Sequence, residues 1–282
     1  MVATNNSAEK STRHVDATRP HRRWLTKGRI TSVVYPTVAL VLVVVGWAFV
    51  KRLFDIKDYL LPSPSAVFST LRHEASYLFE QSMTTLQEVL IGFALAAVIG
   101  VLIGIAIATW RPVEQAVYPL LVASQEIPQV AFAPLLLVWF GFGITSKVII
   151  AFLIAFFPIV VNTAVGLRSV PPELVDLARA TRAPAHKVLR KIRFPYALPH
   201  VFTGLKIGAT FAVIGAVVGE FVGAGNGLGY VLVTANGRLN TALMFAAIIV
   251  LVILGLGLFF IISVIERLVI PWHASQRGNK AG

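Results

Sequence analysis

Long apolar runs alternate with short polar segments along most of the chain. Each run is roughly twenty residues long, enough for a helix to cross a hydrocarbon core of about 30 Å. The pattern therefore predicts a transmembrane domain over residues 30–270, with both of its ends on the same side of the membrane. The predicted spans are about six, near 31–50, 84–109, 115–140, 147–168, 201–224 and 242–266.

Polar segments flank the predicted domain at both ends. Residues 1–29 contain seven Lys and Arg and few apolar side chains, which predicts a disordered basic tail. Residues 271–282 form a second polar tail. The first apolar run is not followed by the pattern of a signal-peptide cleavage site, so we expect this run to be retained as a span.

Composition agrees with a helical membrane protein. Apolar residues make up 56% of the chain and charged residues only 13%, whereas about a quarter of residues are charged in soluble domains. The chain has no cysteine, which excludes disulfides, thiolate metal sites and a cysteine nucleophile. Its six histidines lack the spacing of metal ligands. We expect an all-α integral membrane protein without a metal site.

The net charge of +12 would suggest a nucleic-acid partner in a soluble protein, but here it follows a topology rule. With the N-terminus in the cytoplasm, 19 Lys and Arg lie in cytoplasmic segments and 6 in outer segments. Basic residues accumulate on the cytoplasmic side of membrane proteins. The chain is therefore expected to be multi-pass in the inner or plasma membrane, with both termini inside and no nucleic-acid partner.

The outer segment 51–82 contains a turn-rich stretch, "LLPSPSAV". We expect a short helix at the membrane surface from Ser65 to Leu71, with the Ser65 side chain capping its first turn. A docking patch for an outer partner is the functional alternative.

Small residues recur every fourth position in two of the predicted spans. Such stripes lie on one helix face and allow close helix packing in a membrane, where lipid gives no hydrophobic drive for association. We expect these helices to pack on one another, with the fifth span also near the axis of a homodimer. The stripes are Gly92, Ala96, Gly100, Gly104 and Ala108; Gly204 and Gly208; and Gly215, Gly219 and Gly223.

Polar residues inside the spans are candidates for the translocation pathway. Pro128 and Pro134 are expected to bend or break the third span. A carboxylate near mid-membrane costs about 2.5–3.5 kcal/mol on insertion scales, so it often marks a pathway. A hydrogen-bonded structural role is the alternative for each carboxylate. The candidates are Gln125, Glu126, Pro128 and Glu220.

The segment "ELVDLARATRAPAHKVLRKIRFPYALP", residues 173–199, interrupts the apolar pattern. Its periodicity predicts two short amphipathic helices, the second beginning at Pro184. We expect Pro195 to end the second helix and Pro199 to open the next span. The result is a basic hairpin on the cytoplasmic face between the fourth and fifth spans. A surface helix held by anionic lipid is one interpretation.

The order of residues favours another interpretation, because the hairpin resembles the EAA loop of ABC importer permeases. The resemblance rests on acid-x-Ala-Arg at residues 176–179, the small-residue turn at 183–184 and "FPYALP". In that family the loop inserts into a cleft of a cytoplasmic ATPase. It implies ATPase coupling for Asp176, Ala178, Arg179, Arg182, Ala183 and Pro184, and a loop-shaping role for Pro195 and Pro199.

Four further stretches resemble the nitrate, sulfonate and taurine branch of these permeases, which also includes carriers of thiamine-pyrimidine precursors and riboflavin. They are "LLPSPSAV", "PLLLVWFGFG", "FFPIVVNTAVGLRSV" and "GAVVGEFVGAGNGLGYVL". The resemblance implies a second permease copy, two ATPase subunits and an outer or lipid-anchored solute-binding protein. The solute would be a small anion or a heterocyclic vitamin precursor.

The chain itself lacks G-x-x-x-x-G-K-[ST], the loop that cradles ATP phosphates. We therefore expect no cofactor of its own and no enzymatic activity, with ATP bound by the partner ATPase. A secondary transporter or a channel independent of an ATPase is the alternative function. The chain shows no internal repeat and no filter-like segment that would favour either.

One residue departs from the family pattern. The family has glycine three residues after the Arg of this motif, where this chain has Arg182. Glycine at such a turn indicates a positive φ, which costs a non-glycine residue roughly 1–2 kcal/mol. Either Pro184 reshapes the turn by imposing an extended residue before it, or a contact of Arg182 offsets the strain.

Overall fold

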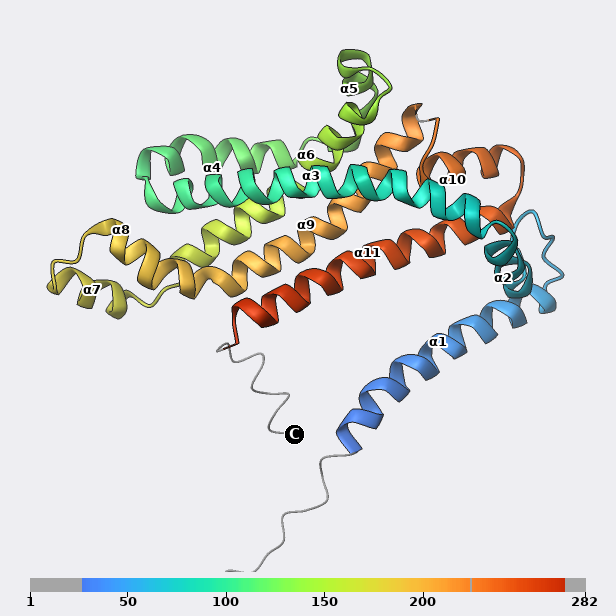
Figure 1. Cartoon of the computed structure of the whole chain (residues 1–282), viewed down its shortest axis with the longest axis horizontal. Coiled ribbons are helices and arrows are strands. Elements are labelled where there is room, and N and C mark those ends of the chain that lie inside the picture. Colours follow the sequence, from blue (N-terminus) through green and yellow to red (C-terminus); the bar gives the residue numbers. More distant parts are fainter. Residues whose placement is uncertain (1–26, 224, 272–282) are drawn as a thin grey trace, which may run out of the picture.

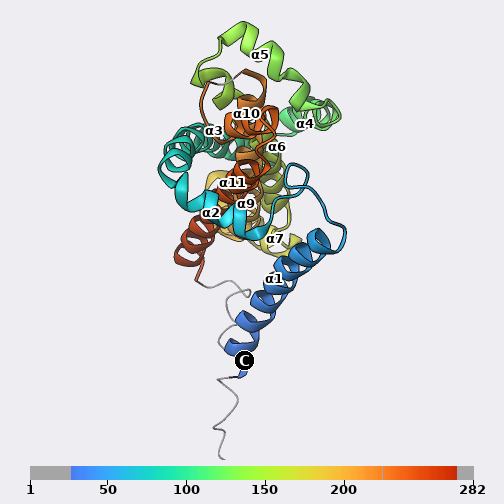
Figure 2. The same cartoon turned by 90° about the vertical axis from the view of Figure 1, so that its right-hand side faces the viewer.

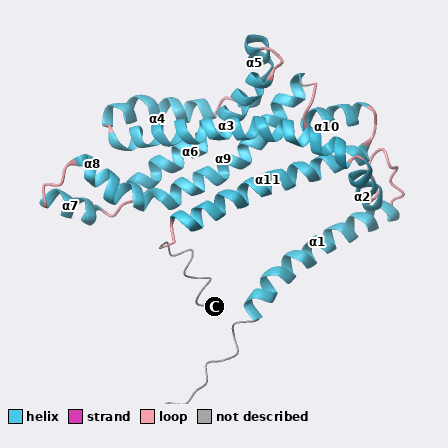
Figure 3. Cartoon of the chain, in the orientation of Figure 1, coloured by secondary structure: helices cyan, strands magenta, loops and turns pink. Residues whose placement is uncertain are grey.

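The computed structural model of the chain describes residues 27–223 and 225–271, and all regular secondary structure in them is helical (Figures 1 and 3). The predicted all-α membrane class is confirmed. Among the described residues, five helical stretches are long and apolar enough to span a membrane. They are Val34–Leu53 within α1 (Lys27–Leu53), α3 (Ala75–Thr109), α6 (Ile144–Arg168), Ala185–Gly223 and α11 (Thr241–Val269). The predicted tails fall largely on 1–26 and 272–282, outside the described residues.

Helices α3, α6 and α11 run toward one end of the molecule, and α1 and the helical stretch Ala185–Gly223 run the other way (Figure 1). The hairpin of α7 (Pro172–Ala180) and α8 (Ala185–Val188) lies at one end of the molecule. The short helices α2 (Pro64–His73) and α10 (Leu228–Gly237) lie at the other end (Figure 1). The first residues of α1 and the last residues of α11 point toward the hairpin end. This is the arrangement expected when both termini and the basic hairpin share one side of a membrane.

The third predicted span, 115–140, is not one helix. Pro128 has an extended backbone (φ −61°, ψ 98°) and no amide hydrogen, so it separates the two parts. Pro134 causes no bend, contrary to expectation, because it lies in the first turn of a helix, where no amide donor is needed. The parts are α4 (Arg111–Gln125), the 3₁₀ turn η1 (Gln129–Phe132) and α5 (Ala133–Phe140), which projects from the body (Figure 2). The number of membrane crossings stays a prediction.

Helix α6 forms the centre of the bundle, packed between α3 and α9 (Phe194–Gly223). A Cβ atom added at Gly92 of α3 would lie 2.7 Å from the Cβ of Ala151. One added at Gly215 of α9 would lie 2.6 Å from the Cα of the same residue. The predicted close packing is confirmed, and α6 is held on two sides. The other glycines that meet α6 this closely are Gly100, Gly104, Gly204 and Gly208, with Gly219 slightly less close.

The packing of α9 bears on the expectation that the fifth span lies near a homodimer axis. Its glycines at 204, 208, 215 and 219 all face α6 within the same chain. That stripe is therefore not a spare surface for a second copy, and it gives no reason to place α9 at a two-fold axis.

The short helix of the outer segment begins earlier than expected. Ser63, not Ser65, is its N-cap residue, and the Ser63 hydroxyl accepts a hydrogen bond from the Ala66 N–H at 3.2 Å. Pro64 then occupies the first helical position, which suits its fixed φ and missing donor. The expected cap was wrong because proline moved the helix start toward the N-terminus.

Helices α1, α7 and α10 are each followed, two residues after their last residue, by a non-glycine residue with positive φ. These residues are Asp55, Arg182 and Leu239, with φ of 45°, 53° and 54°. The residue after each of them donates its backbone N–H to the carbonyl of the residue five positions before the donor, which is the hydrogen bond of a Schellman cap. The three bonds are Ile56 to Lys51 at 3.1 Å, Ala183 to Ala178 at 3.0 Å and Asn240 to Ala235 at 2.9 Å.

The second arm of the hairpin does not stop at Pro195. Helix α8 continues through the π-helical turn η2 (Leu189–Arg193) into α9, and Pro199 lies inside that helix. The π turn is wider than an α-helical turn, and the Phe194 N–H donates to the carbonyl of Leu189. Such local adjustments let membrane helices accommodate proline, so the predicted stop at Pro195 and the predicted start at Pro199 were wrong.

Candidate functional site

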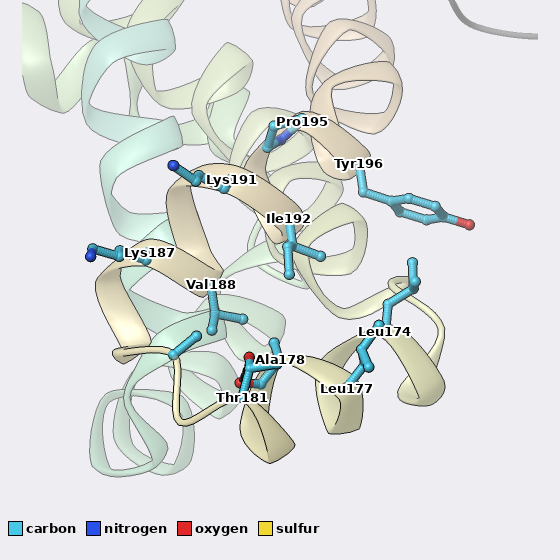
Figure 4. A pocket seen from close by; sticks show the side chains of 11 residues that line it. Leu174, Leu177, Ala178, Thr181, Lys187, Val188, Lys191, Ile192, Pro195 and Tyr196 are labelled. Atoms are coloured by element: carbon cyan, nitrogen blue, oxygen red, sulfur yellow. Dashed lines mark hydrogen bonds between the residues drawn. The ribbon is translucent and has the colours of Figure 1, made fainter.

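The hairpin encloses a groove of about 620 Å³ between its two arms (Figure 4). Apolar side chains from both arms point into it, and Lys187 and Lys191 extend from the second arm (Figure 4). Leu174 and Leu177 remain 42% and 64% exposed. The surface combines an apolar floor with a basic rim, which suits contact with another protein. The groove is lined by Leu174, Leu177, Ala178, Thr181, Ala183, Lys187, Val188, Lys191, Ile192, Pro195 and Tyr196.

Ala178 organises the turn between the arms. Its side chain is buried, and its carbonyl accepts hydrogen bonds from the Ala183 N–H and the Thr181 hydroxyl, both at 3.0 Å. Pro184 follows in an extended conformation and caps the second arm. Its carbonyl accepts the N–H of Lys187 at 2.9 Å. Ala183 and Pro184, the small-residue turn of the EAA-loop resemblance, thus lie where the chain reverses direction.

Arg182 keeps the backbone conformation that glycine would favour, with a φ of 53°. The turn is therefore not reshaped around Pro184, and the first alternative drawn from the sequence was wrong. Its side chain is exposed, as are those of Asp176 and Pro184. The side chain of Arg179 lies outside the described part of the chain.

A buried polar cluster lies at the opposite end of the bundle. Glu220 of α9 is 1% exposed. One of its carboxylate oxygens accepts the Thr85 hydroxyl of α3 at 2.7 Å, and the other accepts the Gly229 N–H of α10 at 2.6 Å. The carboxylate is thus hydrogen-bonded on both sides, which favours the structural alternative for Glu220 over a pathway role.

The same cluster caps the first turn of α10. The Leu228 N–H donates to Thr85 Oγ1 at 2.9 Å, and the Gly227 N–H donates to Gln81 Oε1 at 2.7 Å. These amides have no partner within their own helix. A carboxylate close to them is also favoured by the helix dipole. Side chains of α3 and α9 therefore anchor α10 to the bundle.

Glu88 and Lys147 extend the cluster, and sequence reasoning missed both. Lys147 Nζ lies 2.9 Å from Glu88 Oε1 in the bundle interior. Glu88 falls inside the predicted span 84–109, so the rule that singled out Glu220 applies to it equally. Lys147 was counted as an outer loop charge, but its side chain is only 3% exposed.

The remaining pathway candidates do not join this cluster. Glu126 is the C-cap residue of α4 and its side chain is exposed. Pro128 lies two residues further on, at the break before η1. Of Gln125 only the backbone, at the end of α4, lies within the described part. These residues mark the broken third segment rather than a polar site.

The arrangement defines a multi-pass helical membrane protein with a two-armed helical hairpin at one end. Residues 96–271 match the family described as "Binding-protein-dependent transport system inner membrane component". The chain belongs to this family, and it is the permease subunit of an ABC importer in the inner or plasma membrane. Family membership implies an ATPase and a solute-binding protein as partners.

Curated relatives agree with this assignment. The chain is 40% identical to a probable ABC transporter permease of Haemophilus influenzae, over 77% of this chain and 89% of the relative. It is 41% identical to the riboflavin transport system permease RibX of Chloroflexus aurantiacus, over 84% and 90%. It is 39% identical to the formylaminopyrimidine transport permease ThiX of Halalkalibacterium halodurans, over 86% and 96%.

A solved structure agrees with the fold. A chain of the inward-facing MetNI methionine ABC transporter superposes with a TM-score of 0.61 at 23% identity. The match covers 68% of this chain and 95% of that chain. The helical bundle is therefore the fold of an importer permease.

Proposed function

We propose that two copies of this chain form the translocation pathway of the importer, with the hairpin of α7 and α8 on the cytoplasmic side. Each hairpin docks on one ATPase subunit, which binds the ATP. A binding protein delivers the solute to the opposite end, where α2 and α10 lie. ATP-driven motion of the ATPases reaches the spans through the continuous helix from Ala185 to Gly223.

The shape of the hairpin carries this proposal. A helix held by lipid needs one continuous apolar face toward the membrane. Here the apolar side chains line a groove between two arms, and a Schellman cap at Arg182 closes the turn. A rigid concave surface with exposed leucines and a basic rim suits a folded protein partner better than a bilayer.

The solute is drawn from two classes that the relatives suggest. Relatives named for riboflavin and formylaminopyrimidine transport are 41% and 39% identical to this chain. Relatives named for aliphatic sulfonate and taurine transport are 29% identical, and one named for nitrate import is 30% identical. We propose a small solute of one of these classes: a vitamin-related heterocycle or a small anion.

The proposal is tested by breaking the hairpin. Proline at 178 removes an amide donor and clashes with the preceding turn of α7, so Ala178→Pro is expected to release the ATPase or to uncouple ATP hydrolysis from transport. Ser69→Pro is the matched control for ATPase co-purification, because it breaks α2, a helix of similar length at the other end of the molecule. Co-purification of the ATPase and hydrolysis in liposomes give the readout. An Ala178→Pro complex that stays assembled and coupled would contradict the proposal.

A further inference from the structure

A pocket of about 310 Å³ lies halfway along α6, away from both the hairpin and the polar cluster. Its lining comes from one face of α6, the 3₁₀ turn η1 and α9. The size falls at the lower end of the range for small-molecule sites. It is lined by Gln129, Ile154, Phe157, Pro158, Val161, Asn162 and Phe211.

Two amide side chains give the pocket its polar character. Asn162 Nδ2 donates to the Pro158 carbonyl at 2.8 Å, which leaves its second amide hydrogen and its oxygen available. Gln129 lines the pocket from η1. Pro158 has no amide hydrogen, so α6 lacks the usual donor for the carbonyl of Ile154, another lining residue. The pocket thus offers donors and acceptors side by side.

The rest of the lining is aromatic and aliphatic. Phe157 and Phe211 contribute rings, and no lining residue is charged. An anion transferred into such a site would lose its hydration without gaining a cation, which is strongly unfavourable. A planar uncharged ring can stack on phenylalanine and pair its polar edge with amides. The lining therefore discriminates between the two solute classes.

The mouth of the pocket does not suit lipid. Phe211 is 40% exposed, so the pocket opens at the surface of this chain. Amide groups that face hydrocarbon are costly, and polar side chains in spans usually face protein or a wet cavity. A second copy that covers this opening would complete the chamber.

We propose that this pocket is half of a transient site for a planar, uncharged nitrogen heterocycle of the pyrimidine class, with Asn162 and Gln129 on its polar edge. Phe157 and Phe211 stack on the ring. The inference rests on the proposed permease function, and it selects the heterocycle over the small anion.

The test uses the complete importer, with permease, ATPase and binding protein, in liposomes. Labelled formylaminopyrimidine, taurine and nitrate are the probes, and initial ATP-driven uptake is measured at saturating binding protein. We expect uptake of the pyrimidine. Asn162→Leu and Phe211→Ala should each reduce it by about tenfold or more, since one stacked ring or amide pair is worth a factor of this size.

Two control variants separate the pocket from general damage. Thr210→Val removes a hydroxyl that donates to the carbonyl four residues earlier, as the Asn162 amide does, but Thr210 lies outside the pocket. Phe260→Ala removes an exposed ring of α11. Both should keep pyrimidine uptake within about twofold of the unmodified importer. A variant that loses its ATPase on purification is replaced by Asn162→Ser or Phe211→Leu.

The possible outcomes are distinct. Taurine or nitrate uptake without pyrimidine uptake overturns the inference and leaves the permease function intact. Pyrimidine uptake that Asn162→Leu and Phe211→Ala leave unchanged overturns the site. Loss of the ATPase from the unmodified complex, with no ATP-driven uptake of any of these probes, overturns the proposed function and the inference with it.

Discussion

Lys147 Nζ lies 2.9 Å from Glu88 Oε1, and the two side chains are 3% and 0% exposed. The pair joins α6 to α3 in the interior of the bundle. Thr85, one helical turn before Glu88 on α3, donates its hydroxyl to Glu220, so the pair lies beside the hydrogen bonds that hold α10. An ion pair at this depth makes each member dependent on the other, because neither charge has access to bulk water.

Removal of one member of this pair should destabilise the permease. Lys147→Met leaves the Glu88 carboxylate buried without its cation, at an expected cost of about 3–5 kcal/mol. The double variant with Glu88→Gln should recover part of that loss. Thermal unfolding of the purified permease in detergent measures both. A Lys51→Met variant is the control, since Asp58, the partner of Lys51, is 80% exposed and such pairs contribute up to about 1 kcal/mol. Equal losses in the two single variants would contradict the assignment.

Gly227 is expected to tolerate no side chain. Its φ is +100°, and an added Cβ would lie 2.0 Å from Glu220 Oε1. Gly227→Ala should therefore displace the carboxylate from the amides of α10 and lower expression and thermal stability. Gly225→Ala is the matched control, because nothing lies within 4 Å of its added Cβ. The expectation fails if the two variants are equally stable.

Arg182→Gly should be tolerated or should stabilise the hairpin. Glycine adopts the positive φ of this position without the cost of roughly 1–2 kcal/mol that other residues carry. Arg182→Val should weaken the turn, because β-branched residues are the poorest fit to that conformation. ATPase retention during purification is the measurement. If glycine releases the ATPase as valine does, the Arg182 side chain makes a contact of its own with the ATPase.

Arg179→Ala should weaken ATPase association or uncouple hydrolysis from transport. The resemblance places this residue at the coupling position, and truncation of a charged partner at a desolvated interface often costs about 2–5 kcal/mol. Arg267→Ala removes an exposed basic side chain from α11, outside the hairpin, and should have little effect. Hydrolysis and uptake measured side by side distinguish the two variants.

The orientation in the membrane is accessible by labelling, because the chain has no cysteine of its own. A cysteine at exposed Arg238, beside α10, should react with an impermeant reagent from outside the cell. A cysteine at exposed His186 in the hairpin should react only after the membrane is opened. Outside labelling at 186 would reverse the topology.

The hydrophobic pattern and the distribution of charge were sufficient to predict the class of protein and much of the hairpin. The apolar runs predicted the long helices, because a span must satisfy its own backbone and cover about 30 Å. The glycine spacing predicted close packing, which is now seen at Ala151, where α3 and α9 both approach α6. The family position of Arg182 left a reshaped turn and a positive φ as alternatives, and the φ of 53° selects the second.

Proline was the main source of wrong boundaries. Its local effect is fixed, but whether it stops, starts or merely perturbs a helix depends on neighbouring turns. Pro128 breaks the third segment and Pro134 lies in the first turn of α5. Pro195 and Pro199 lie within a continuous helix that η2 adjusts. Ser63 replaced Ser65 as the cap for the same reason.

Tertiary structure alone decided which polar residues meet. Glu88, Lys147 and Glu220 come from three helices and are distant in the chain, so their pairing depends on how α3, α6 and α9 rotate about their axes. Gln129, Asn162 and Phe211 are likewise brought together around one pocket. Hydrophobic pattern sets which segments enter the membrane, but helix rotation follows from the close contacts of small residues, and those contacts exist only once the helices pack.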